Sequence, residues 1–129
     1  MTAISGFHTI IYSDDAAATR AFLRDVLGWP AVDAGGGWLI FKTPPSEAGV
    51  HPTQDGDTND RWARTPFHQS SLMCDNITAA IAELQDKGVS VKPDVEDQGF
   101  GLVTSFEMPG AGWMLLYEPR HPVAHNLMT

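Results

Sequence analysis

The sequence predicts an α+β fold built from two tandem copies of one βαβββ unit. The stretch 7–15 (FHTIIYSDD) is echoed sixty residues later at 67–76 (FHQSSLMCDN). In each half a helical pattern follows and ends at a glycine, Gly28 or Gly88, twenty residues after the histidine. Because the order and spacing of these features repeat, we expect the two units to form one curled, cup-like mixed sheet.

The elements of each unit follow from periodicity and from turn residues. In unit one (6–51), Asp14 or Asp15 is expected to cap a helix whose apolar positions include Phe22 and Leu23. Unit two (67–119) is expected to start its helix at Asn76. Alternation and turn signals predict strands at 6–13, 31–33, 38–41 and 48–51 in unit one, and at 67–74, 89–91, 102–107 and 113–118 in unit two.

Length and composition favour a single domain over residues 1–129, with a polar linker at 52–66 and a tail at 120–129. A net charge of −8 makes nucleic acid and anionic membrane surfaces unexpected partners. The only cysteine, Cys74, cannot form an internal disulfide and is expected to be a buried, inert thiol. The N-terminus has no secretion-signal pattern, so we expect a cytoplasmic protein.

The segment from His8 to Asp15, with Phe22 six residues before Gly28, resembles the opening of proteins of the vicinal oxygen chelate superfamily. This superfamily includes glyoxalase I, extradiol dioxygenases, and fosfomycin and bleomycin resistance proteins. The resemblance runs from Gly6 to Pro119 and implies the fold more firmly than the chemistry, because one fold hosts many activities.

The resemblance implies two first-strand ligands for a divalent metal such as Zn, Ni, Fe or Mn. His8 occupies the position in unit one. In unit two the internal repeat selects His68, whereas alignment through the turn at Asp75 selects Gln69. Adjacent strand residues face opposite sides, so only one of these two can point into the cup.

The carboxylates that complete such a site are missing. The resemblance places them at Ala48 and Leu115, neither of which can bind a metal. His51 and Glu118 lie three residues further along, on the opposite face of a regular strand, and are alternatives only if bulges re-aim them. We expect structural roles for both, such as a salt link from Glu118 to Arg120.

Aromatic residues on the predicted strands suit a flat or conjugated ligand. The glycine-flanked loop 96–101 is a candidate lid over the cup, although an ordinary connection fits equally. The ligand-binding candidates are His8, Tyr12, Trp38, Phe41, Phe100, Trp113, Leu115 and Tyr117.

Two hypotheses follow from this pattern. The preferred one is a small-molecule binding protein of the glyoxalase and bleomycin resistance type, which requires no cofactor and holds its ligand at a crevice completed in a homodimer. The alternative is a metal-dependent dioxygenase, lyase or epimerase that uses His8 and His68. A metal-free enzyme with one of these histidines as general base is a further possibility.

Overall fold

The fold, described for residues 3–54 and 56–127 in a computed structural model, combines two helices with short and longer strands. These elements confirm the predicted α+β class. The first half contributes α1 (Ala16–Asp25), β1 (Ala31–Asp33) and β2 (Leu39–Phe41), and the second half contributes β3 (Ser71–Met73), α2 (Ile77–Asp86), β4 (Glu96–Asp97), β5 (Gly101–Met108) and β6 (Gly112–Pro119).

Both helices begin and end in the same way, as the sequence repeat predicts. Asp15 caps α1 by accepting a hydrogen bond from Ala18 N at 3.1 Å, and Asn76 caps α2 by accepting one from Ala79 N at 3.0 Å. Gly28 and Gly88 follow the helices with φ of 72° and 82°, a left-handed conformation that glycine adopts without strain.

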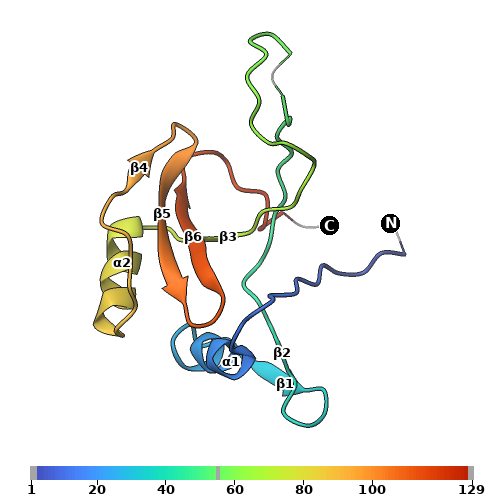
Figure 1. The fold of residues 1–129 in the computed structure, drawn as a ribbon, viewed down its shortest axis with the longest axis vertical. Helices are drawn as coiled ribbons and strands as arrows, with labels where there is room; N and C mark the ends of the chain where they lie inside the picture. The colour runs from blue at the N-terminus through green and yellow to red at the C-terminus, as the bar shows by residue number, and fades with distance from the viewer. Residues whose placement is uncertain (1–2, 55, 128–129) are drawn as a thin grey trace.

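The strands of the described residues form a two-stranded and a four-stranded sheet. The second half makes a four-stranded sheet in the order β3-β6-β5-β4, in which β3 runs parallel to β6 and the other pairs are antiparallel. The hairpin of β1 and β2 stands apart, next to α1 (Figure 1). In one chain, therefore, the second unit forms a regular four-stranded sheet and the first unit contributes only a short hairpin.

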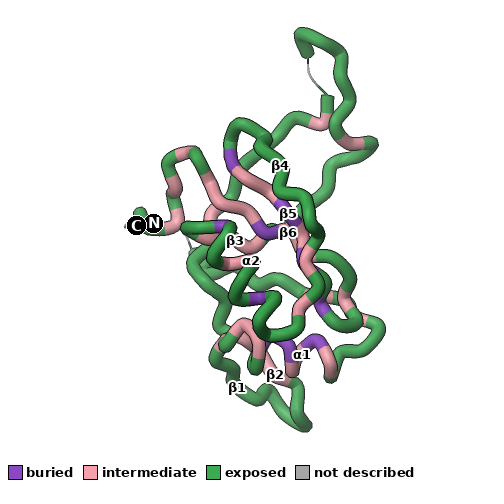
Figure 2. The backbone as a smooth tube through the Cα atoms, turned by 90° about the vertical axis from the view of Figure 1, so that its left-hand side faces the viewer, coloured by how far each residue is buried: buried purple, intermediate pink, exposed green. Residues whose placement is uncertain are grey.

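The core lies where the two helices meet the four-stranded sheet (Figure 2). Phe22 of α1 stacks on Phe106 of β5 with ring centroids 6.0 Å apart, and Phe106 is only 1% exposed. Ile77 and Leu84 of α2 pack into the same cluster with Leu116 of β6. Burial of these apolar side chains stabilises the two helices on one face of the sheet.

The turn between β5 and β6 docks against the start of α1 and joins the two halves. Asp14 N donates to Gly110 O at 2.8 Å, and the buried Thr19 hydroxyl donates to Pro109 O at 2.6 Å. Gly110 has a φ of 78°, and a Cβ there would lie 2.8 Å from Asp15 N. Glycine is required here because the two backbones approach too closely for a side chain.

Several predicted strands are absent or shortened. The segments 6–13 and 48–51 are not strands, 67–74 is reduced to β3, and 89–91 keeps a single bridge between Val91 and Phe106. The N-terminal segment instead runs away from the sheet (Figure 1). Alternating apolar residues cannot form a strand without a neighbouring backbone to pair with. Within the described residues, neither helix is long and apolar enough to cross a membrane.

Candidate functional site

The four-stranded sheet has one face that the helices leave uncovered, which we call the open face. Its members follow from strand alternation and from the pairing register, since paired residues point to the same side. Thr104, Phe106 and Leu116 are buried on the helix side, and the residues between them point away. The open face consists of Ser71, Met73, Val103, Ser105, Glu107, Trp113, Leu115 and Tyr117.

Three residues of β6 line the open face from end to end. Trp113 is 48% exposed, and Lys92 Nζ lies 5.0 Å from the centre of its ring. Leu115 is in the middle, beside Ser105 and Ser71. Tyr117 is at the far end, about 13 Å along the strand from Trp113. Apolar and aromatic side chains of β6 therefore run along this surface, with serines beside them in the middle and a lysine and a tyrosine hydroxyl at the two ends.

Glu118 faces the helices and acts on α2. Its Oε1 accepts a hydrogen bond from Ile77 N at 3.0 Å, which satisfies a first-turn amide that has no partner within the helix. The expected salt link with Arg120 is absent, because Arg120 pairs instead with Asp97 at 2.8 Å. Leu115, and not Glu118, therefore occupies the open-face position at which the family resemblance places a metal-binding carboxylate.

The predicted metal ligands are dispersed. His8 and His68 are exposed, in segments that are not strands, and His51 lies edge-on to Trp62 at 5.4 Å. Gln69, the alternative to His68, also precedes β3 in this irregular segment. The described part of the chain contains no group of three or more His, Cys, Asp or Glu side chains able to hold a metal ion. Over residues 3–54 and 56–127 of one chain, the predicted donors therefore lie apart from one another.

The predicted aromatic ligand residues fall into separate groups. Tyr12 is 90% exposed beside a shallow hollow of about 410 Å³ near the β5–β6 turn. Trp38 lies under the guanidinium of Arg20, 5.4 Å from the ring centre, and Phe41 packs against the core. Phe100 and Tyr117 do meet, edge to face, with centroids 6.0 Å apart.

The loop 96–101 makes contacts at its β4 end and with the end of β6. Residues 96 and 97 form β4, and Asp97 accepts hydrogen bonds from Gly99 N and from Arg120. These donors, with the backbone amide first, lower the pKa of Asp97. The loop is better described as a braced hairpin end than as a free lid.

Cys74 follows β3 and is half-buried next to the Tyr117 carbonyl. Burial raises the pKa of its thiol to about 11, and the negative charges of Glu118 and Asp75 add to this effect. The thiol is therefore protonated at neutral pH, as expected for an inert cysteine.

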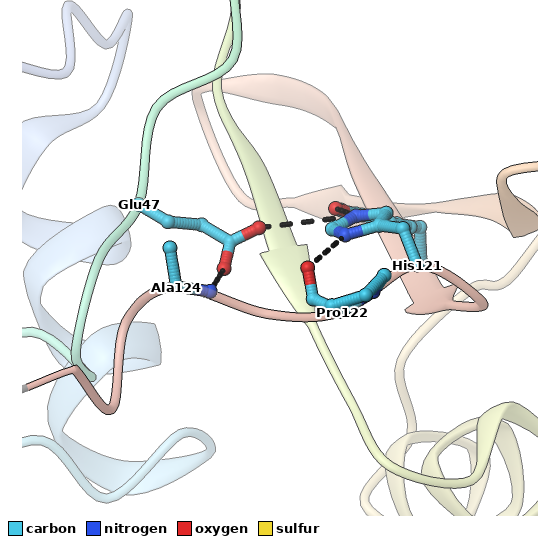
Figure 3. Close-up of polar contacts among 5 residues, drawn as sticks. Glu47, His121, Pro122 and Ala124 are labelled. Atoms are coloured by element: carbon cyan, nitrogen blue, oxygen red, sulfur yellow. Dashed lines mark hydrogen bonds and ion pairs between the residues drawn. The ribbon is translucent and has the colours of Figure 1, made fainter.

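A polar cluster at the Tyr117 end was missed by the sequence analysis. His121 Nε2 lies 2.8 Å from the Tyr117 hydroxyl and 3.8 Å from Glu47 Oε2 (Figure 3). Glu47 Oε1 also accepts a hydrogen bond from Ala124 N at 2.9 Å. The four-residue spacing of Tyr117 and His121 at a strand end was a usable signal, whereas nothing in the sequence pointed to Glu47 as their partner.

The open face thus joins apolar and aromatic side chains of β6 to a polar cluster at its Tyr117 end. The chain belongs to the Glyoxalase/Bleomycin resistance protein/Dioxygenase superfamily, whose family model matches residues 7–121. The expected resemblance is thereby confirmed over nearly all of the chain. A comparison with curated proteins found no match.

Solved structures with this fold differ in what their names record. A lactoylglutathione lyase from Agrobacterium tumefaciens is 17% identical, with 91% of this chain and 96% of that chain covered and a TM-score of 0.59. TnmS3, an antibiotic binding protein from Streptomyces sp. CB03234, is 19% identical, with 92% and 99% covered and a TM-score of 0.60. A superfamily member from Sphaerobacter thermophilus is 24% identical, with 91% and 99% covered and a TM-score of 0.56. At these identities the likeness shows the fold alone.

Proposed function

We propose that this protein is a small-molecule binder whose ligand lies against the open face. The observation that carries the proposal is the line of Trp113, Leu115 and Tyr117 on a sheet face that no helix covers. A flat ligand that stacks there gains apolar burial and aromatic contact, while polar groups at the two ends orient it. The antibiotic binding protein TnmS3 shares the fold and offers a precedent for this use.

The identity of residue 115, a leucine, favours this proposal over the metal-dependent alternative. An aliphatic side chain at this position adds apolar contact for a ligand and no oxygen donor for a metal. Glu118, the nearest carboxylate along β6, is already engaged with the α2 amide. A metal enzyme based on His8 and His68 would need ligands from outside the arrangement seen in one chain.

We further propose that a second copy of the chain completes the cup. The segment 6–13 carries exposed Phe7, Ile10 and Tyr12, and its repeat partner 67–74 contains β3, which pairs with β6. The outer edge of β3 has no neighbour in the sheet order of the described residues. An apolar strand-like segment and an open sheet edge on identical chains favour a symmetric homodimer.

Dimer formation is tested by light scattering coupled to size-exclusion chromatography. Wild type should run at twice the mass of 14.0 kDa, and Ile10→Asp should shift it toward the monomer, because a charge would be placed in the proposed interface. Thr9→Asp, on the other side of the same segment, is the matched control. A monomeric wild type would refute the dimer.

The binding site is tested by a thermal-shift screen of planar aromatic compounds against wild type and Ser105→Trp. The bulky side chain would fill the space beside Leu115 and abolish the ligand-induced rise in melting temperature. Thr78→Trp, at an exposed position of α2, is the matched control and should keep the response. A hit that survives Ser105→Trp would place the site elsewhere.

Metal analysis tests the metal-dependent alternative. Tag-free protein loaded with zinc, nickel, iron or manganese is measured by inductively coupled plasma mass spectrometry, for wild type and His8→Ala. The binder proposal expects no stoichiometric metal in either. One metal per chain or per dimer, lost in His8→Ala, would overturn it and direct the search to lyase, epimerase and oxygenase substrates.

A further inference from the structure

A phenol, an imidazole and a carboxylate from three parts of the chain meet at one end of the open face. Tyr117 comes from β6. Figure 3 shows its two partners, His121 from the tail that follows β6 and Glu47 from the segment after β2. Glu47 is 15% exposed and His121 34% exposed at the side chain. The cluster is thus sheltered but still open to a molecule that lies on the sheet.

The hydrogen bonds of His121 fix which ring nitrogen carries the proton. Nδ1 lies 2.8 Å from the Pro122 carbonyl oxygen, which can only accept, so Nδ1 must be the N–H nitrogen. In the neutral ring Nε2 is then a bare acceptor, and the hydroxyl of Tyr117 donates to it across 2.8 Å. The Tyr117 proton is therefore committed to His121.

The Tyr117 oxygen consequently presents only lone pairs to the open face. Glu47 acts on the phenol itself, because its Oε1 accepts a hydrogen bond from Ala124 N and its negative charge disfavours loss of the Tyr117 proton. Burial, and then the charge of Glu47, raises the pKa of Tyr117, so the hydroxyl remains protonated at neutral pH.

The ring of Tyr117 is held in place from both sides. A Cβ on Gly101 would lie 3.0 Å from the Tyr117 ring, so glycine leaves the room that the ring occupies. Phe100 contacts the ring edge to face and is itself 51% exposed. The Asp97–Arg120 ion pair ties the loop that carries Phe100 to the end of β6. A flat group next to the hydroxyl would meet a preformed aromatic edge.

We infer that Tyr117, oriented by His121, is the polar end of the site and selects ligands that bear a hydrogen-bond donor on a planar conjugated ring, such as a phenol or an enol. This inference rests on the proposed function, since it names the ligand class for the open face. A ligand carbonyl at the same point would face lone pairs and lose its hydrogen bond, which disfavours acceptor-only ligands.

The test compares phenol with anisole, which has the same ring but no donor, at pH 8 by protein-observed NMR titration. Phenol should bind wild type about five-fold more tightly than anisole, the effect expected for one neutral hydrogen bond. In Tyr117→Phe, which keeps the ring and the packing, the preference should fall to about one. An equal affinity of both probes for wild type, or a preference kept in Tyr117→Phe, would overturn the inference.

A second measurement does not depend on any ligand. The ¹⁵N chemical shifts of the His121 ring are assigned by comparison with His121→Gln. When the imidazole is neutral, they should report a protonated Nδ1 and an unprotonated Nε2. The opposite tautomer would overturn the inference directly.

If a compound from the thermal-shift screen binds the open face while phenol and anisole are bound equally, the proposed function stands and only the donor selectivity falls. If Ser105→Trp leaves every hit unchanged, both fall.

Discussion

Replacement of Glu118 by alanine should destabilise the fold while leaving the open face intact. In wild type the Glu118 carboxylate accepts a hydrogen bond from Ile77 N at 3.0 Å, and Ile77 is 2% exposed. Without that acceptor, a helix-terminal amide at a buried residue has no partner, and a negative charge is lost from the N-terminus of α2. Hydrogen bonds to charged groups contribute about 1.5–3 kcal/mol, so we expect a loss of about 2 kcal/mol.

This loss is measured by urea denaturation, supported by the melting temperature. For a chain of this length, about 2 kcal/mol corresponds to a fall of roughly 8 °C. Glu118→Gln keeps an oxygen acceptor and should lose about half as much. Glu107→Ala, an exposed glutamate on the other face of the sheet, is the matched control. If Glu118→Ala unfolds at the same urea concentration as Glu107→Ala, the capping role assigned to Glu118 is wrong.

Three further predictions concern other groups. Cys74, with its thiol pKa raised to about 11, should react with iodoacetamide at pH 8 about 200-fold more slowly than an unperturbed thiol; a rate within ten-fold of free cysteine would contradict this. Because donation by Ala124 N lowers the pKa of Glu47, this contact should persist at neutral pH and weaken as pH falls through the lowered pKa. Hydrogen exchange at Ala124 should then show protection at pH 7 that Glu47→Gln reduces, and equal protection in both proteins would count against the contact. Thr19→Val should cost about 1 kcal/mol, because it removes the hydrogen bond from the buried Thr19 hydroxyl to the Pro109 carbonyl; urea denaturation measures this loss, and an unchanged midpoint would show that the hydrogen bond is not stabilising.

The local signals of the sequence predicted the helices correctly. Asp15 and Asn76 are the caps, and Gly28 and Gly88 have the left-handed conformation that ends a helix. These features depend on residues within a few positions of each other, so a single sequence contains them. The strands predicted at 102–107 and 113–118 are present as β5 and β6, each slightly longer than predicted.

Strands that depend on distant partners were predicted less well. The alternation at 6–13 is clear in the sequence, yet pairing needs an edge that this segment does not reach in one chain. The prediction that Glu118 lies on the strand face opposite to Leu115 agrees with its hydrogen bond to Ile77 N on the helix side. This prediction required only the alternation of side chains along one strand. The Glu47–His121 contact could not be predicted, since it joins two irregular segments whose approach no periodicity describes.

The contact of the β5–β6 turn with α1 also bears on the order of folding. The hairpin closes over a short stretch of chain, while Thr19 reaches Pro109 across 90 residues. Loop closure over that span costs more entropy than closure of the hairpin turn, so the hairpin can form first and offer a surface for the earlier-synthesised helix. Helix α1 could then dock only after the last quarter of the chain has been synthesised, and any delay in synthesis would prolong the exposure of its apolar face.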